Sequence, residues 1–374
     1  MPRFLHTADW QIGRQYSKFA PDDAVALAEA RLTAVERIAE LADQEAVDAV
    51  LVAGDVFDAQ TVSDRTIRRL FNAMAAYTGP WLLISGNHDA ALAESVWTRA
   101  QRLGAVPDNA HLALAPDVLE FIEAGFVVLP APLTQRHTQS DLTNWFDRAE
   151  TPAGLVCIGL AHGSIQGVLA EDVDSPNPIA ADRAATAQLD YLALGDWHGT
   201  KRINARTWYS GTPEQDRFKG NDPGNVLLVD IPEAGAEPRV DVRAIGQHPW
   251  IQMTERLTVS SDLDQLVTKL KQQPEKAVVA LRLEGEISLL GKQQLEDTLS
   301  VAEARFRSLG YDLSDLRLLA TEEDIAALHA DGYVGQLINE LRDEQEGDDG
   351  EAARDAMAIL ASMLLEKQAL GGGE

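Results

Sequence analysis

The chain has 374 residues, 45% of them hydrophobic and 24% charged, values that fit a globular protein with one large and one smaller domain. Its net charge of −27 argues against tight unaided DNA binding, because non-specific DNA affinity comes from Lys and Arg that neutralise phosphates. A single cysteine, Cys157, excludes an internal disulfide framework, and apolar runs such as residues 49–53 are too short to cross a bilayer. We therefore expect a cytoplasmic protein with no membrane partner and no secretory signal.

Short runs rich in Val, Ile and Leu alternate with helical patterns over residues 1–231. We predict buried strands at residues 4–8, 50–54, 82–86, 155–162, 191–195 and 226–231. Helices are predicted at residues 23–43, 63–77 and 94–103, with Asp22 or Asp23 capping the first and Ser63 the second. This alternation predicts an α/β layer architecture.

The composition changes at residues 232–249 to Pro, Gly and Ala with scattered charge, which predicts a linker. A β-α-β-α-β pattern follows, with strands at 252–259, 277–283 and 313–318 and helices at 262–272 and 289–309. We therefore divide the chain into a large domain, a linker, a small α+β domain and a tail: residues 1–231, 232–249, 250–320 and 321–374.

The tail is acidic and helical in pattern, with 14 acidic and 3 basic side chains over residues 320–374. Residues 322–342 and 352–369 have helical patterns, and the second carries an apolar stripe. The stripe consists of Ala356, Ile359, Leu360, Met363 and Leu364. It either packs onto the chain's own domain or docks against another protein.

Five short polar motifs stand at the carboxyl ends of predicted strands, the edge where open α/β sheets bind ligands. They are Asp9-Trp10-Gln11, Gly54-Asp55, Gly86-Asn87-His88-Asp89, Ala161-His162-Gly163 and Gly195-Asp196-Trp197-His198. Imidazole, carboxylate and amide groups together suit Mn, Zn or Fe. Two such ions sharing a carboxylate clamp a phosphoryl group and activate a water.

These motifs resemble those of the calcineurin-like metallophosphoesterases, and within them the SbcD-like DNA-repair exonucleases. The first motif is His6-Thr7-Ala8-Asp9-Trp10-Gln11-Ile12-Gly13, and residues 54–58 and 86–89 are similar to the second and third. Residues 192–198, followed by 202–204 and 209–213, resemble the last. The resemblance covers residues 1–230. It implies a four-layer α/β/β/α sandwich with a small capping domain and a helical C-terminal tail.

The resemblance also implies a role for each matching residue. One metal would be held by Asp9, Gln11, Asp55 and His198, and the other by Asp55, Asn87, His162 and Asp196. His88 would face the leaving oxygen and exchange a proton there. Asp89 would orient His88 or, as an alternative, serve only as a turn residue.

Two residues depart from the family pattern. Gln11 stands where the family usually has His, and Asp196 replaces the first His of its last motif. The set becomes richer in oxygen, which favours Mn²⁺ or Mg²⁺ and leaves a metal-bound water less acidified. A weakened or inactive enzyme is the alternative to an active one.

The first functional hypothesis is a DNA exonuclease or endonuclease subunit that acts in DNA repair. The resemblance implies an SbcC-like coiled-coil ATPase as partner and a homodimer, with Lys201, Arg202 and Arg206 contacting phosphates. A second hypothesis is a phosphodiesterase or phosphatase acting on nucleotides or other small phosphates. A third is a catalytically impaired scaffold subunit of an ATPase complex. Trp10 and Trp197 either stack on a base or pack in the core.

Overall fold

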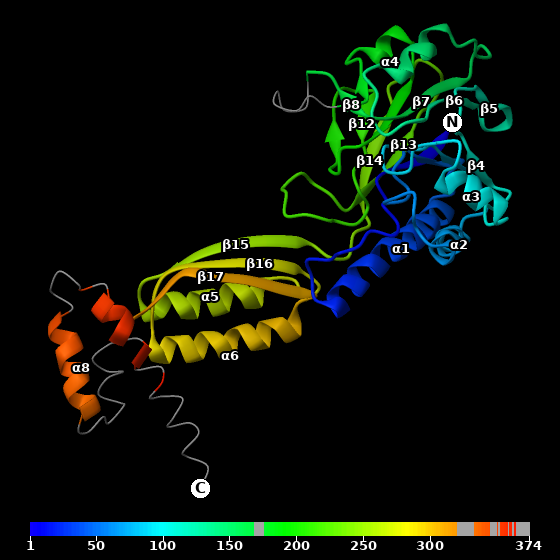
Figure 1. Cartoon of the computed structure of the whole chain (residues 1–374). Coiled ribbons are helices and arrows are strands. Elements are labelled where there is room, and N and C mark those ends of the chain that lie inside the picture. The colour runs from blue at the N-terminus through cyan, green and yellow to red at the C-terminus, as the bar shows by residue number, and fades with distance from the viewer. Residues whose placement is uncertain are drawn as a thin grey trace. The chain divides into compact units, whose positions relative to one another are not determined.

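The computed structural model describes residues 1–167, 176–319, 333–344, 350, 352–357, 359–360 and 363. They form two compact units, Met1–Pro249 and Trp250–Glu374. Each unit has its own hydrophobic core. Figure 1 shows the helices and strands of both units. Among the described residues, no helix is both long and apolar enough to cross a membrane.

Two six-stranded sheets form the centre of the first unit, as far as its residues are described. The first sheet has the order β14 (Arg239–Ala244), β13 (Asn225–Asp230), β1 (Arg3–Thr7), β2 (Ala49–Val52), β3 (Trp81–Leu83), β4 (Ala110–Leu112). The second has the order β11 (Lys201–Arg202), β12 (Thr207–Tyr209), β10 (Tyr191–Gly195), β7 (Val156–His162), β6 (Phe126–Ala131), β5 (Leu119–Phe121). Strands β1 to β4 are parallel, and so are β6, β7, β10 and β12. The carboxyl ends of these strands therefore collect at common edges.

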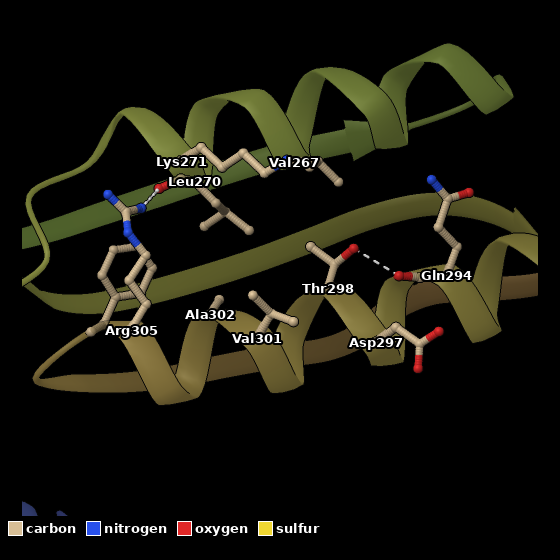
Figure 2. A pocket seen from close by; sticks show the side chains of 10 residues that line it. Val267, Leu270, Lys271, Gln294, Asp297, Thr298, Val301, Ala302 and Arg305 are labelled. Carbon is tan, nitrogen blue, oxygen red and sulfur yellow. Dashed lines mark hydrogen bonds between the residues drawn. The ribbon is translucent and has the colours of Figure 1, made fainter.

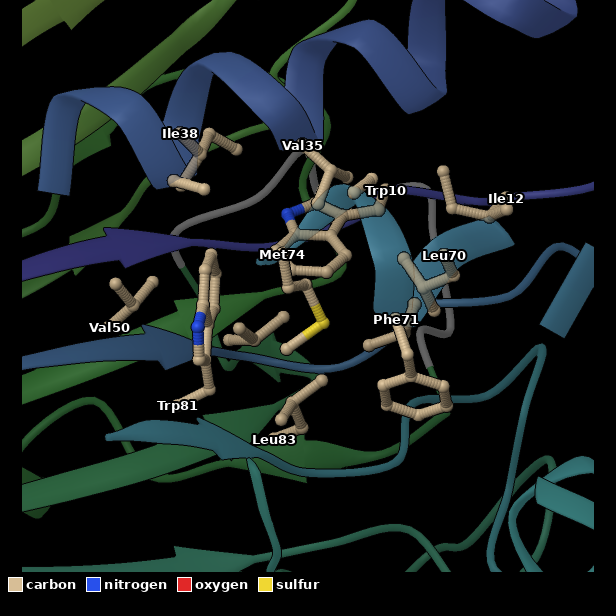
Figure 3. Packing of buried hydrophobic residues seen from close by; sticks show 14 of the residues in the cluster. Trp10, Ile12, Val35, Ile38, Val50, Leu70, Phe71, Met74, Trp81 and Leu83 are labelled. Atoms are coloured by element: carbon tan, nitrogen blue, oxygen red, sulfur yellow. The ribbon is translucent and has the colours of Figure 1, made fainter. Parts of the chain in front are cut away.

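The two sheets pack face to face with helices on their outer faces, which confirms the predicted four-layer sandwich. Successive side chains of β2 point to opposite faces of the sheet. Ala49 and Leu51 face the core between the two sheets, and Val50 and Val52 face the outer helices. Helices α1 (Pro21–Gln44), α2 (Asp64–Ala73) and α3 (Val96–Arg102) cover the first sheet. Figure 3 shows Val35 of α1 and Leu70 of α2 in the core that packs on this sheet. The second sheet is covered by η2 (Leu142–Arg148) and α4 (Arg183–Thr186). Smaller elements are η1 (Ile122–Ala124), β8 (Ser164–Ile165) and β9 (Pro178–Ile179).

Two local predictions for this unit are corrected by the structure. Helix α1 begins at Pro21, with Ala20 as a cap residue that makes no side-chain hydrogen bond. Asp22 and Asp23 lie instead in the first turn, where their charge favours the positive end of the helix. Part of the predicted linker, Arg239–Ala244, pairs with β13 as the edge strand β14. Ser63 does cap α2, because its hydroxyl accepts from Thr66 N at 3.1 Å.

The second unit contains a three-stranded parallel sheet with two helices packed on it. Its elements follow the predicted order: β15 (Trp250–Leu257), α5 (Ser260–Gln272), β16 (Val278–Ser288), α6 (Leu289–Arg305), β17 (Ser308–Leu319). An apolar pocket of about 260 Å³ lies between α5 and α6 (Figure 2). It is lined by side chains such as Leu270, Val301 and Phe306. Among the residues that the structure describes, no cluster of metal-ligand type lies in this pocket.

The acidic tail is described only in part. Helix α8 (Tyr333–Glu344) overlaps the second half of the predicted helical stretch 322–342 and extends two residues beyond it, and the first residues of that stretch lie outside the described part. Of the predicted apolar stripe, Ile359 and Met363 are exposed, and Leu364 lies outside the described residues. Two neighbouring residues, Ala353 and Met357, are buried.

Candidate metal centre

The loops after β1, β2 and β10 hold four of the predicted ligands in an unusual backbone conformation. The φ values of Asp9, Gln11, Asp55 and Asp196 are +55°, +45°, +51° and +100°, in a region that residues other than glycine seldom adopt. Hydrogen bonds hold the loops together, with Asp9 N donating to Gly54 O at 3.1 Å. Such strained positions cluster at functional sites, where the surrounding structure over-determines them.

Gly86 allows the third motif to approach Asp55 closely. A Cβ atom at this position would lie 2.2 Å from Asp55 Oδ1 and 2.4 Å from its backbone nitrogen. With glycine there, His88 N donates to Asp55 Oδ1 at 2.9 Å. The glycine therefore lets two motifs separated by about thirty residues share one carboxylate.

Asp9, Asp55 and His162 form a compact group of possible ligands. One ligand atom from each lies within 4.8 Å of the others, and all three residues are buried. His162 Nδ1 bonds the carbonyl of Ala53 at 2.8 Å, which turns Nε2 toward the group. That Nε2 lies 3.6 Å from Asp55 Oδ1.

Two further predicted ligands border this group. Asn87 Oδ1 lies 2.9 Å from His162 Nε2, and Asp196 Oδ1 lies 3.6 Å from the same atom. Asp196 N also donates to both oxygens of Asp9, at 3.2 Å each. The structure thus brings together all the residues predicted for the second metal.

The electrostatics of the group favour a bound cation. Burial raises the pKa of Asp9 to about 6 because it disfavours the charged carboxylate. Burial also disfavours a charged His162, but the carboxylates of Asp55, Asp196 and Asp9 outweigh it and raise the pKa of His162 to about 9. The negative charge of several buried carboxylates thus keeps a proton on the imidazole of His162. A divalent ion would replace this proton and take its place among the carboxylates.

The donor set of this group fits a divalent ion. Carboxylate, imidazole and amide oxygen groups converge, and Ala53 fixes the imidazole from behind, as in known metal sites. A divalent ion bound there would polarise a phosphoryl oxygen and acidify a water. The chain's own residues supply the orientation and the dry surroundings.

His88 stands beside the group and keeps one ring nitrogen available for proton exchange. Its Nδ1 lies 2.8 Å from the carbonyl of Asp58, which can only accept, so Nδ1 carries a hydrogen. Its Nε2 lies 3.9 Å from Asp55 Oδ2, and the side chain is about 29% exposed. An imidazole in this position can give a proton to a leaving oxygen or take one from a water.

Asp89 does not orient the ring of His88; Asp58 does. The carboxylate of Asp89 accepts backbone hydrogen bonds from Val56, Phe57 and Gly86 at 2.8, 3.1 and 2.6 Å. Burial and the nearby charge of Asp55 raise its pKa to about 7. Asp89 therefore holds together the two loops that carry the centre. Of its two predicted roles, this is closer to that of a turn residue than to that of orienting His88.

Gln11 and His198 do not join the compact group. The Gln11 side-chain oxygen accepts a hydrogen bond from Arg14, and its Nε2 lies 3.4 Å from His198 Nε2. The other ring nitrogen of His198 lies 3.0 Å from Asp216 Oδ2. The first predicted metal site is therefore only partly assembled. Asp9 and Asp55 belong to the compact group, whereas Gln11 Oε1 and His198 Nε2 face the donor groups of Arg14 and Gln11.

Sequence reasoning missed Asp216 and Arg31, which support this side of the centre. Burial opposes the charged form of Asp216, but the hydrogen bond from His198 and the charge of Arg31 lower its pKa below the usual range. Arg31 is 1% exposed, and its Nη2 lies 3.6 Å from Asp216 Oδ2. A signal existed for Arg31, since it shares the apolar face of α1 with Leu27 and Val35.

The predicted basic segment divides into two kinds of side chain. Arg206 has a structural role, because it pairs with Asp190 at 3.1 Å and donates to the carbonyl of Gly235 at 2.6 Å. Arg202 stacks on Trp208 and lies 3.7 Å from Glu237. The guanidinium of Arg206 is therefore engaged by contacts within the protein and is not available to bind a substrate.

Trp197 stands in the sequence between the ligand candidates Asp196 and His198. Lys201 and Lys219 lie over its ring. The two ammonium groups are 5.1 and 4.6 Å from the ring centroid. Trp197 is half-buried, whereas Trp10 is 1% exposed and packs edge-on against Trp81. Core packing is therefore the role of Trp10 (Figure 3), and Trp197 is the aromatic ring beside the centre.

Comparison with known proteins agrees with this geometry. Residues 2–179 match the family model described as calcineurin-like phosphoesterase. The SbcD component of the nuclease SbcCD from Rhodobacter capsulatus is 43% identical over 283 residues, which cover 63% of this chain and 68% of that protein. The DNA double-strand break repair protein Mre11 of Aeropyrum pernix is 26% identical over 271 residues, 67% of this chain and 62% of that protein. The SbcD component of SbcCD from Escherichia coli K12 is 28% identical over 252 residues, with coverages of 56% and 60%.

Fold and sequence together define the chain as a calcineurin-like metallophosphoesterase, a metal-dependent hydrolase of phosphate esters. Within that class it belongs to the SbcD-like family. The family and the sandwich fold predicted from the motifs are thereby confirmed.

Proposed function

We propose that this protein is a metal-dependent DNA nuclease subunit that hydrolyses phosphodiester bonds in DNA repair or processing. The observation that carries the proposal is the convergence of Asp9, Asp55 and His162 beside His88 at one sheet edge. A divalent ion, Mn²⁺ or Mg²⁺, would be held by this group with Asn87 and Asp196 at its border. His88 exchanges a proton with the leaving oxygen through Nε2.

DNA rather than a small phosphate is favoured by the surroundings of the centre. Lys201 and Lys219 flank Trp197, so two cations and an aromatic face lie directly beside the ligand residues. Cations bind a phosphate backbone and an aromatic ring stacks on a base. Arg202 follows Lys201 on β11 and is exposed, but its guanidinium lies 3.7 Å from Glu237, so the two lysines are the cations beside the ring.

The large negative charge implies that DNA affinity comes partly from elsewhere. We infer an SbcC-like coiled-coil ATPase as the partner that supplies it, and a homodimer as the working form, in the cytoplasm. The exposed side chains of Ile359 and Met363 in the acidic tail are the proposed contact for this partner. The related SbcD proteins are by name parts of the nuclease SbcCD.

A direct assay tests the proposed activity. Purified full-length chain with Mn²⁺ is expected to degrade linear duplex DNA, and His88→Ala is expected to reduce the rate by about 10²- to 10⁴-fold while the fold is retained. His111→Ala is the matched control, because His111 is an exposed histidine on β4. Cleavage of nucleotides or model phosphodiesters but not of DNA, with or without the ATPase, would contradict the nuclease proposal and favour a small-phosphate hydrolase.

A further inference from the structure

The two donors missing from the compact group are already engaged by protein hydrogen bonds. An amide coordinates a metal through its oxygen, and the Gln11 oxygen accepts from the guanidinium of Arg14. A guanidinium has only donors, so it determines which end of the amide faces it. The other end, Nε2, is thereby directed at His198 Nε2, 3.4 Å away.

The imidazole of His198 is enclosed by charged and donor groups. Asp216 Oδ2 lies 3.0 Å from Nδ1, and Arg217 Nη2 lies 2.7 Å from Nδ1 and 3.4 Å from Nε2. Nε2 therefore faces two donor groups, the Gln11 amide and the Arg217 guanidinium. Both atoms that would bind the first metal, Gln11 Oε1 and His198 Nε2, thus have protein donors as partners.

Arg14 is fixed in place by carboxylates of its own. Its Nη1 lies 3.2 Å from Asp216 Oδ2 and 3.7 Å from Asp58 Oδ1, and the guanidinium lies over the ring of Tyr16. Asp216 is anchored in turn by the buried Arg31. A dication brought next to this fixed positive charge would be repelled, which opposes a second ion on this side.

We propose that the centre takes one divalent ion, at Asp9, Asp55 and His162, and that Arg14 supplies the second positive charge for the phosphodiester. This inference rests on the proposed metal-dependent function and deepens it. The three polar contacts of Arg14 all use Nη1, within the part of the chain that the structure describes. Nη2 and Nε are therefore left as donors for a phosphate oxygen, which guanidinium groups bind well.

Metal stoichiometry tests the inference without relying on activity. Full-length chain stripped of metal and titrated with Mn²⁺ in a calorimeter is expected to bind one ion. Its electron paramagnetic resonance spectrum should be that of isolated Mn²⁺. Two ions per chain with an exchange-coupled spectrum would overturn the inference and leave the proposed function intact. No bound ion would overturn both.

A paired substitution tests the assignment to Arg14 and Gln11. The double variant Gln11→His with Arg14→Gln restores an imidazole and removes the fixed charge, so it is expected to bind two ions with a coupled spectrum. Arg69→Gln is the matched control, because Arg69 pairs with Glu29 on the exposed surface, and it should still bind one. A folded double variant that binds one ion would contradict the role given to Arg14.

The kinetic effect of Arg14 alone separates a substrate contact from a purely structural one. With one ion bound, Arg14→Gln is expected to raise KM for a model phosphodiester about tenfold, with a smaller change in kcat. Arg14→Lys keeps the charge and should recover part of this loss. An unchanged KM in both variants would overturn the substrate role of Arg14.

Discussion

The two sides of the metal centre use the same sheet edge but reach different arrangements. On one side, His162 is turned inward by a backbone carbonyl, and its Nε2 meets Asp55, Asn87 and Asp196. On the other side, His198 is held by Asp216, and its Nε2 meets the Gln11 amide. On the first side, the donor among the acceptors is the proton of His162, which a bound ion can replace. On the second side, the donors are the Arg14 guanidinium and the Gln11 amide, which do not give up a proton.

This difference shows that a ligand's neighbours decide whether it can bind metal. Ala53 contributes a neutral carbonyl that orients His162 and turns its other nitrogen toward Asp55 and Asn87. Arg14 contributes a positive charge that takes the oxygen of Gln11 and repels a cation. The motifs that supply both sides stand in the family's order, so the order alone does not distinguish the two sides.

The largest effect is expected at Asp55, the residue that both sides were predicted to share. Asp55→Asn keeps the acceptor for His88 N but removes the charge, so Mn²⁺ binding should be lost and hydrolysis should fall on the order of 10³-fold, about 4 kcal/mol in barrier. Calorimetry and DNA degradation measure both effects. Asp117→Asn, at an exposed position, is the control. Near-normal Mn²⁺ affinity in Asp55→Asn would show that the compact group is not the ion site.

The next effect concerns the charged network that supports the His198 side. Asp216→Asn leaves the buried Arg31 without its carboxylate, so the metal-free chain should lose about 3 kcal/mol of unfolding free energy. Glu29→Gln removes an exposed ion pair and should cost less than about 1 kcal/mol. Urea unfolding measures both. Equal losses in the two variants would mean that Asp216 does not anchor this side.

A pH effect of intermediate size is expected from His6, which lies buried beneath the edge. Its Nε2 lies 3.1 Å from the carbonyl of Leu194, and its Nδ1 lies 3.0 Å from the hydroxyl of Tyr191. Burial lowers its pKa from 6.5 to about 3, so the unfolded chain binds a proton that the folded chain excludes. Its contribution to stability is complete above pH 6.5 and is lost as the pH falls toward 3.

The size of this effect follows from proton linkage. Between pH 7 and pH 5 the exclusion of the proton should reduce the unfolding free energy by about 2 kcal/mol. His6→Gln removes the titrating group, so the variant should lose less stability over this pH range than the wild-type chain. Denaturant midpoints at both pH values measure the loss of stability in each chain. Carboxylates titrate equally in the variant and the wild-type chain, so their effects cancel when the two losses are compared. Parallel losses would show that His6 is not the group responsible.

The smallest effect separates the substrate-facing cations from a structural one. Lys201→Gln and Lys219→Gln should each weaken DNA binding a few-fold and reduce the slope of log affinity against log salt by about 1. Arg206→Gln should leave that slope unchanged, because its guanidinium is bound to Asp190. Binding to labelled duplex in the His88→Ala background measures these slopes. A reduced slope for Arg206→Gln alone would reverse the assignment.

Continuous apolar runs and their polar ends were readable in the sequence, whereas edge strands were not. Strands β2, β7 and β10 are buried along almost their whole length, so their runs of Val, Ile and Leu stand out. Strand β14 alternates between exposed and half-buried residues, and for that reason its sequence resembles a linker. The fully buried β6 was also missed; it contains Pro130, a residue unusual within a strand.

By itself, the sequence determined the family, the sandwich and the set of polar residues at the sheet edge, because parallel strands bring their carboxyl ends together whatever the details of the loops. Only the tertiary structure decided which of those residues face an ion. Gln11 meets Arg14 three residues away, but Arg14 is itself paired with Asp216, about two hundred positions further along the chain. Hydrogen-bond partners at such separations leave no spacing pattern, so their competition for a ligand atom appears only when the chain is folded.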